Sequence, residues 1–163
     1  MKVFISYRRG DAVALAGRLY DRLGSRIGVD SVFMDQENIP VGSDFAQTIS
    51  DELAHCDVVM VLIGPKWLEL LKMARESTDF VVEELSTALD HKIPVIPVLL
   101  GDTSMPQESD LPKRIQGLVR TQALRLEPGE RFSSDFERLM QAPPFSASPR
   151  SLLVQCIRSW FRR

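Results

Sequence analysis

The sequence predicts an α/β fold in which helices cover both faces of a five-stranded parallel sheet. Short apolar runs alternate along the chain with stretches whose apolar residues recur every third or fourth position. Strands that alternate with helices are typical of parallel sheets. The run 58–63 is apolar at every position, as expected of a strand covered on both faces. We therefore expect a three-layer, flavodoxin-like architecture.

Local patterns predict the individual elements. Leu15, Leu19, Leu23 and Ile27 recur every fourth residue, which predicts a helix. Strand 93–100 contains two prolines that cannot donate to a ladder, so we expect it at an outer position of the sheet. The expected strands are 2–6, 31–34, 58–63, 93–100 and 121–126, and the expected helices are 11–26, 43–53, 67–71, 80–90, 115–119 and 132–140.

One domain accounts for most of the chain. Residues 1–141 carry the alternating pattern and are enough for a substantial core. Residues 142–149 are rich in Pro and Ser and are typical of a linker. Residues 150–163 form an amphipathic, basic tail. Docking of this tail on the domain is the simplest interpretation, and a partner or an anionic membrane surface are the alternatives.

Composition excludes several classes of function. The net charge of −2 gives no reason to expect a nucleic-acid partner. Two distant cysteines, Cys56 and Cys156, and two histidines indicate neither a disulfide framework nor a zinc site. A first strand that begins at Lys2 leaves no room for a signal peptide, and no apolar run approaches membrane-spanning length. We expect a cytoplasmic protein without a membrane partner.

The fold itself predicts where a ligand binds. In flavodoxin-like sheets, ligands lie outside the carboxyl ends of the strands, where the strand order reverses. This rule nominates residues 6–11 and 64–67, with the loop 35–42 on the same rim. The glycine-rich loops that bind dinucleotides or triphosphates are missing from the sequence.

A pair of side chains in helix 80–90 points to a particular chemistry. Phe80 and Glu84 are one turn apart on one helix face. An aromatic ring beside a carboxylate suits a site that holds a flat cationic ring and stabilises positive charge. Two plainer interpretations are open: Glu84 as a solvated carboxylate, and Phe80 as a core residue.

Four segments in register resemble a bacterial TIR (Toll/interleukin-1 receptor) domain over roughly residues 1–140. They are 4–9 (Phe-Ile-Ser-Tyr-Arg-Arg), 34–42, 56–65 and 96–99. Many TIR domains hydrolyse NAD+ through one glutamate of the third helix, which an aromatic residue, often Trp, precedes by four positions. The resemblance therefore implies that Glu84 is catalytic and that Phe80 holds a ring. Glu83 is the neighbouring alternative, although Phe80 and Leu85 favour Glu84.

The resemblance also implies a substrate and further site residues. NAD+ is expected as the substrate, without cofactor or metal, and the products are nicotinamide with ADP-ribose or a cyclic isomer. Arg8 and Arg9 are expected to meet the pyrophosphate, or else to be solvated or paired with Asp11 and Asp35. The candidate substrate contacts are Ser6, Tyr7, Arg8, Arg9, Asp35, Ile39 and Phe80.

TIR domains also act as adaptors that assemble through their surfaces. The loop after the second strand is a common contact, and here it consists of Glu37, Asn38, Ile39, Pro40, Val41 and Gly42. The resemblance thus leaves two functions open: an NAD+-cleaving enzyme activated by self-assembly, in antiphage defence, or a non-catalytic adaptor. In either case the expected partners are further copies of the chain and a sensor or effector region.

Overall fold

In the computed structural model, which describes residues 1–34, 53–74 and 79–146, five strands form one parallel sheet. The strand order is β2-β1-β3-β4-β5, and every pairing is parallel. This order confirms the predicted flavodoxin-like fold. The strands are β1 (Val3–Ser6), β2 (Val32–Met34), β3 (Val58–Ile63), β4 (Val95–Leu100) and β5 (Leu124–Leu126).

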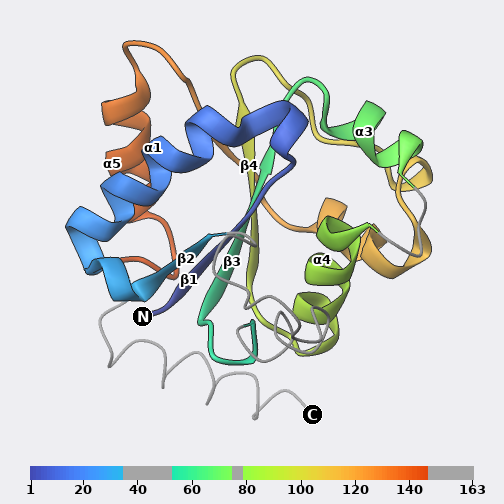
Figure 1. The fold of residues 1–163 in the computed structure, drawn as a ribbon, viewed down its shortest axis with the longest axis horizontal. Helices are drawn as coiled ribbons and strands as arrows, with labels where there is room; N and C mark the ends of the chain where they lie inside the picture. The colour runs from blue at the N-terminus through green and yellow to red at the C-terminus, as the bar shows by residue number, and fades with distance from the viewer. Residues whose placement is uncertain (35–52, 75–78, 147–163) are drawn as a thin grey trace, which may run out of the picture.

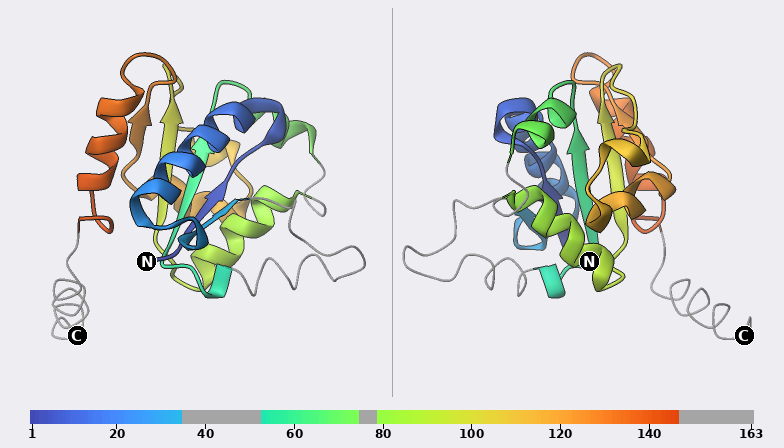
Figure 2. Two further views of the ribbon diagram at one scale, coloured as in Figure 1. Left: turned by 60° about the vertical axis from the view of Figure 1, so that its left-hand side comes forward. Right: turned by 90° about the vertical axis from the view of Figure 1, so that its right-hand side faces the viewer.

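Helices cover both faces of this sheet (Figure 1). Helices α1 (Arg9–Ile27) and α5 (Phe132–Gln141) lie on one face, and α3 (Trp67–Met73) and α4 (Phe80–Asp90) lie on the other. The turned views in Figure 2 show the same three layers. Short 3-10 helices complete the described chain: η1 (Val29–Ser31), η4 (Glu108–Asp110) and η5 (Lys113–Arg120). Within the described ranges, no helix has the length and apolar character needed to cross a membrane.

Side-chain alternation along the strands divides the core into two layers. Val3 and Ile5 of β1 pack toward α1 and α5, whereas Phe4 packs toward α3 and α4. Strand β3 behaves in the same way, with Met60 on one side and Val61 on the other. Because β1 and β3 are buried on both faces, their carboxyl ends are firmly held, and the residues that follow start from fixed points.

Most predicted elements are confirmed, two of them to the residue. Strand 58–63 and helix 80–90 have the expected bounds. Helix α1 begins at Arg9, earlier than expected, because the Arg8 carbonyl already accepts hydrogen bonds from the amides of Asp11 and Ala12. The predicted loop 35–42, the loop 75–78, most of helix 43–53 and the tail lie outside the described residues.

The prediction that strand 93–100 lies at an outer position is wrong. Strand β4 pairs with β3 on one side and β5 on the other. The Val59 amide donates to the Pro94 carbonyl, so even-numbered residues of β4 direct their backbone groups toward β3. Pro97 therefore faces β5, whose register with β4 begins only at Val98. The position of the missing N–H of Pro97 lies just before the ladder between β4 and β5 starts. An inner strand therefore tolerates this proline.

Candidate functional site

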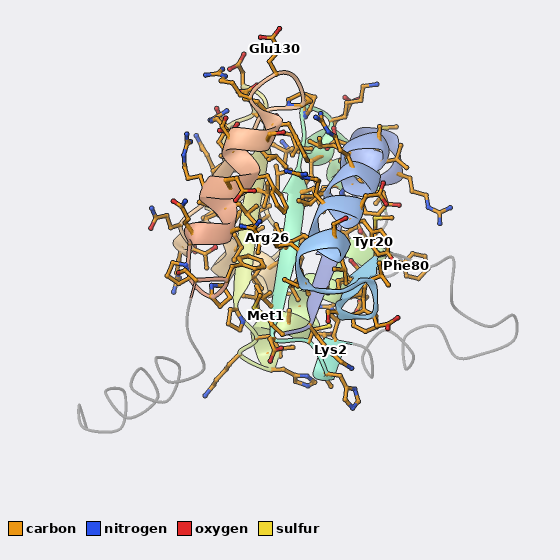
Figure 3. The ribbon with its side chains drawn as sticks, turned by 90° about the vertical axis from the view of Figure 1, so that its left-hand side faces the viewer. Met1, Lys2, Tyr20, Arg26, Phe80 and Glu130 are labelled. Atoms are coloured by element: carbon orange, nitrogen blue, oxygen red, sulfur yellow. The ribbon has the colours of Figure 1, made fainter. Side chains whose placement is uncertain are left out.

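The Glu84 carboxylate lies buried against the carboxyl end of β1. Ser6, the last residue of β1, donates from Oγ to Glu84 Oε2 at 2.6 Å. Glu84 is only 3% exposed, and Ser6 is buried as well. Phe80 begins the same helix but is 43% exposed, and Figure 3 shows its ring projecting from the surface. Helix α4 therefore offers a ring to the outside and a carboxylate to the inside.

The amino end of α4 is held by a buried ion pair. Asp79 caps the helix, because its Oδ1 accepts from the Val82 amide at 3.3 Å. Its other oxygen, Oδ2, accepts from Arg8 Nη2 at 2.7 Å. The Arg8 guanidinium lies over the Trp67 ring, with Cζ at 5.2 Å from the ring centroid. Asp79 is thus the partner of Arg8. Of the two alternative partners considered from the sequence, Asp11 binds the amides of Gly64 and Lys66 instead, and Asp35 lies outside the described residues.

Glu83 occupies a different environment from its neighbour. Its two oxygens accept from Arg114 Nη1 and Nη2 at 2.8 and 2.6 Å, on an exposed part of the surface. These hydrogen bonds hold the pKa of Glu83 below its usual value of 4.5. Adjacent positions on a helix face different directions, so α4 presents one acid to Arg114 and the other to β1.

A crevice of about 410 Å³ opens beside the amino end of α4. It combines cationic groups with an apolar wall that includes Phe80 and the exposed Met73. Among the described residues, Glu84 is not part of the lining, and it lies buried one turn along α4 from Phe80. The lining comprises Tyr7, Arg8, Arg9, Gly10, Leu70, Met73, Ala74, Asp79, Phe80 and Val81. We call this the α4 crevice.

A larger crevice, of about 880 Å³, lies at the ends of β3 and β4. The start of α1, the ends of the two strands and the loop 101–107 line it, and we call it the β4 crevice. Here Asp11 accepts from the amides of Gly64 and Lys66, both at 2.8 Å. A Cβ on Gly64 would lie 2.5 Å from Asp11 Oδ2, so glycine is needed for this close approach.

The structure brings together five of the predicted substrate contacts. Tyr7, Arg8, Arg9 and Phe80 line the α4 crevice, and Ser6 contacts Glu84 behind it. Arg9 is exposed and lines both crevices. The remaining predicted residues, Asp35 and Ile39 together with the other residues of the loop 37–42, lie outside the described residues.

Three residues of this region were missed from the sequence. Asp79 directly precedes an apolar helical run, which is the position of an N-cap. Its partner Arg8, however, lies 71 positions away in the sequence. Leu70 and Met73 line the crevice from α3; the sequence places Leu70 in the short predicted helix 67–71, and Met73 lies beyond the predicted end of that helix. Such long-range neighbours depend on how α3 and α4 pack on the sheet.

Comparison with known proteins identifies a family and several solved structures that resemble this chain. A family model described as a TIR domain matches residues 3–140. The TIR domains of the activated Roq1 resistosome, which recognises the pathogen effector XopQ, share the fold with a TM-score of 0.64 at 13% identity, covering 86% of this chain and 97% of that one. A metazoan TIR-STING receptor from C. gigas, in complex with 2',3'-cGAMP, gives a TM-score of 0.57 at 18% identity.

The TIR-STING match covers 83% of this chain but only 38% of the receptor chain. No curated protein matched the sequence. At these identities the solved structures show the fold alone. The family model spans most of the chain, from the first residue of β1 to a residue within α5. This protein belongs to the TIR domain family.

Proposed function

We propose that this protein cleaves NAD+ at the bond between nicotinamide and ribose. The products are nicotinamide with ADP-ribose or a cyclic isomer, as expected from the resemblance to NAD+-cleaving TIR domains. One observation carries the proposal: the buried carboxylate of Glu84 is held by Ser6 at the carboxyl end of β1, next to a crevice with an exposed ring and cationic groups.

The chemistry of NAD+ explains why one carboxylate is enough. When the C–N bond breaks, its electron pair moves to the nicotinamide nitrogen, and the cationic ring leaves as a neutral molecule. Ordinary glycosidases need a second carboxyl group to protonate the leaving oxygen, and this reaction does not. The remaining task is to stabilise positive charge on the ribose, for which a fixed carboxylate in a water-poor site is well suited. Water then attacks C1′ and loses a proton, or a nucleophile of the same nucleotide closes a ring.

Other residues of the α4 crevice suit the rest of the substrate. The exposed Phe80 ring provides a stacking surface for a flat base. Arg9, at the start of α1, places a cation and the positive end of a helix dipole where a pyrophosphate would bind. Tyr7 lines the same space. We keep Asp35 and Ile39 as proposed contacts from the neighbouring loop.

We further propose that self-assembly activates the enzyme. Glu84 is almost fully buried, so a substrate reaches it only when the crevice opens toward β1. The apolar side chains of Met73 and Phe80 are exposed at the rim, where a second copy can bind and change this surface. A role in antiphage defence in the cytoplasm follows from the resemblance and belongs to the same proposal.

The test is nicotinamide release, followed by chromatography over a wide range of protein concentration. We expect release that rises more steeply than in proportion to protein concentration, together with a nucleotide peak that identifies the linear or cyclic product. The Glu83→Gln variant serves as a control that should release nicotinamide like the wild type, because Glu83 faces Arg114 on the surface. Absence of release at every concentration would contradict the proposal and favour an adaptor.

A further inference from the structure

Two side-chain contacts join the end of β1 to α4. Ser6 donates to Glu84, and Arg8, two residues further along the chain, donates to Asp79. On the helix, the two acceptors are five positions apart, one at the cap and one in the second turn. A helix held at two points against one strand end has little freedom to slide or rotate. Both contacts therefore fix the position of α4 relative to β1.

Asp79 divides its two oxygens between two tasks. Oδ1 accepts from the Val82 amide and starts the helix, and Oδ2 accepts from Arg8. The guanidinium thus ties the first turn of α4 to the end of β1. Both side chains are withdrawn from water, at 9% exposed for Arg8 and 2% for Asp79. An ion pair at this depth is screened little by salt.

Arg8 is itself fixed by a third element. Its guanidinium lies over the ring of Trp67, the fully buried first residue of α3. A planar, delocalised cation suits both this stacking contact and the hydrogen bond to the carboxylate, whereas the point charge of lysine suits neither as well. Strand β1, helix α3 and helix α4 therefore meet at one guanidinium.

Stability alone is a weak reason for a buried ion pair. Apolar side chains of similar volume often stabilise a protein as well or better, because burying two charges has a desolvation cost. Such pairs are best justified where they fix one arrangement among several. Here the arrangement that they fix carries a carboxylate at the centre of the proposed reaction.

We propose that Arg8 and Asp79 form a positioning pair, which sets the distance between Glu84 and the end of β1. The catalytic consequence rests on the proposed function, whereas the geometric consequence does not. On this account Arg8 acts through Asp79 and α4, and Arg9 is the arginine that meets the pyrophosphate. A misplacement of about 1 Å at a reacting group is enough to lower a rate about 100-fold.

The informative substitution is Asp79→Asn. Asparagine is as good an N-cap as aspartate, so α4 keeps its start. Its single side-chain oxygen then serves the cap, and its amide group faces the Arg8 guanidinium, which accepts no hydrogen bond. We expect kcat for NAD+ to fall about 10- to 100-fold while KM changes less than about threefold. Arg8→Lys is expected to act in the same direction.

A single substitution in this pair leaves one buried charge without its partner, which can prevent folding. A double variant avoids this problem. Arg8→Met with Asp79→Asn removes both charges, so no unpaired ion stays buried. If the two residues act as one unit, this double variant loses about as much kcat as Asp79→Asn alone. The matched control is Glu83→Gln, which breaks an ion pair on the same helix but away from β1, and its kcat should stay within about twofold.

Crystal structures of the variants give a readout that needs no turnover. In the wild type, Ser6 Oγ lies 2.6 Å from Glu84 Oε2. We expect this hydrogen bond to be broken in Asp79→Asn and intact in Glu83→Gln. If the wild type releases no nicotinamide, the proposed function fails, and this distance alone decides the positioning pair. An intact bond in Asp79→Asn, a kcat within twofold of wild type, or an Arg8→Lys effect confined to KM would overturn the inference.

Discussion

The two crevices at the carboxyl edge of the sheet share Arg9 and Gly10 but differ in chemistry. The β4 crevice has about twice the volume, at about 880 Å³ against about 410 Å³. In it, the backbone amides after β3 are already bound by the chain's own carboxylate, Asp11. The α4 crevice has cationic groups, an exposed ring, and Glu84 buried beside β1.

If the proposed function holds, volume is a poor guide to the site in this chain. The rule for flavodoxin-like sheets nominates amides where the strand order reverses, because such amides suit an anion. In this chain Asp11 takes the place that an anionic ligand would occupy. The groups that suit NAD+ lie instead on the other side of the α1 start, between α3 and α4.

Replacement of Glu84 tests the α4 crevice most severely. Glu84→Gln keeps an oxygen that accepts from Ser6, so the fold should persist with little change in Tm. Loss of the negative charge should lower NAD+ turnover about 100- to 1000-fold, the range seen when one charge-stabilising group is removed. Nicotinamide release and thermal unfolding, measured on the same sample, check both points. A folded variant that keeps its turnover would remove Glu84 from the reaction.

Replacement of Gly64 tests the contact that occupies the β4 crevice. In Gly64→Ala the new methyl group meets the Asp11 carboxylate, which must move and release two amides. We expect a loss of about 2–4 kcal/mol in the free energy of unfolding, measured with urea. In an Asp11→Ala background the same change should destabilise much less. Equal effects in both backgrounds would show that Asp11 does not fill this position.

Replacement of Phe80 tests which of the two crevices binds NAD+. Its ring is exposed, so Phe80→Ala should change stability little but raise KM for NAD+ about tenfold through loss of stacking. Phe80→Trp, with a larger ring, should match or improve on the wild type. Met105→Ala, in the β4 crevice, is the control and should leave KM within about twofold. A larger effect at Met105 than at Phe80 would reverse the assignment.

The smallest predicted effect concerns Glu83, the exposed carboxylate of α4. Because Arg114 lowers the pKa of Glu83 in the folded state, the pair stabilises the protein above the usual carboxyl pKa, and this contribution is lost as pH falls. For so exposed a pair we expect about 0.5 kcal/mol between wild type and Glu83→Gln at pH 7. The difference should disappear between about pH 5 and about pH 2. A difference that grows in acid would contradict this assignment.

The fold was predictable because its signals are local. Buried strands such as 58–63 are apolar throughout, and helix 80–90 carries a cap and a periodic face. The position of strand β4 was not predictable in this way. Proline excludes a strand from a ladder only if its nitrogen faces a neighbour, and which side Pro97 faces depends on the register with β3.

The candidate site was predictable only in part. Phe80 and Glu84 were found because the helical repeat links positions four apart. Their opposite exposures follow from packing against β1, which no local pattern encodes. Likewise, the positive charge of Arg8 was visible in the sequence, but its partner Asp79 is 71 positions away and its stacking contact is on a third element.

The central claim is that NAD+ binds in the α4 crevice, and an NMR titration tests it most directly. NAD+ is added to the Glu84→Gln variant, which should bind without turnover, while backbone amide shifts are followed. The account predicts shifts at Tyr7, Phe80 and Val81, which line only the α4 crevice. Shifts confined to Ser104, Met105 and Gln107, which line only the β4 crevice, would contradict it.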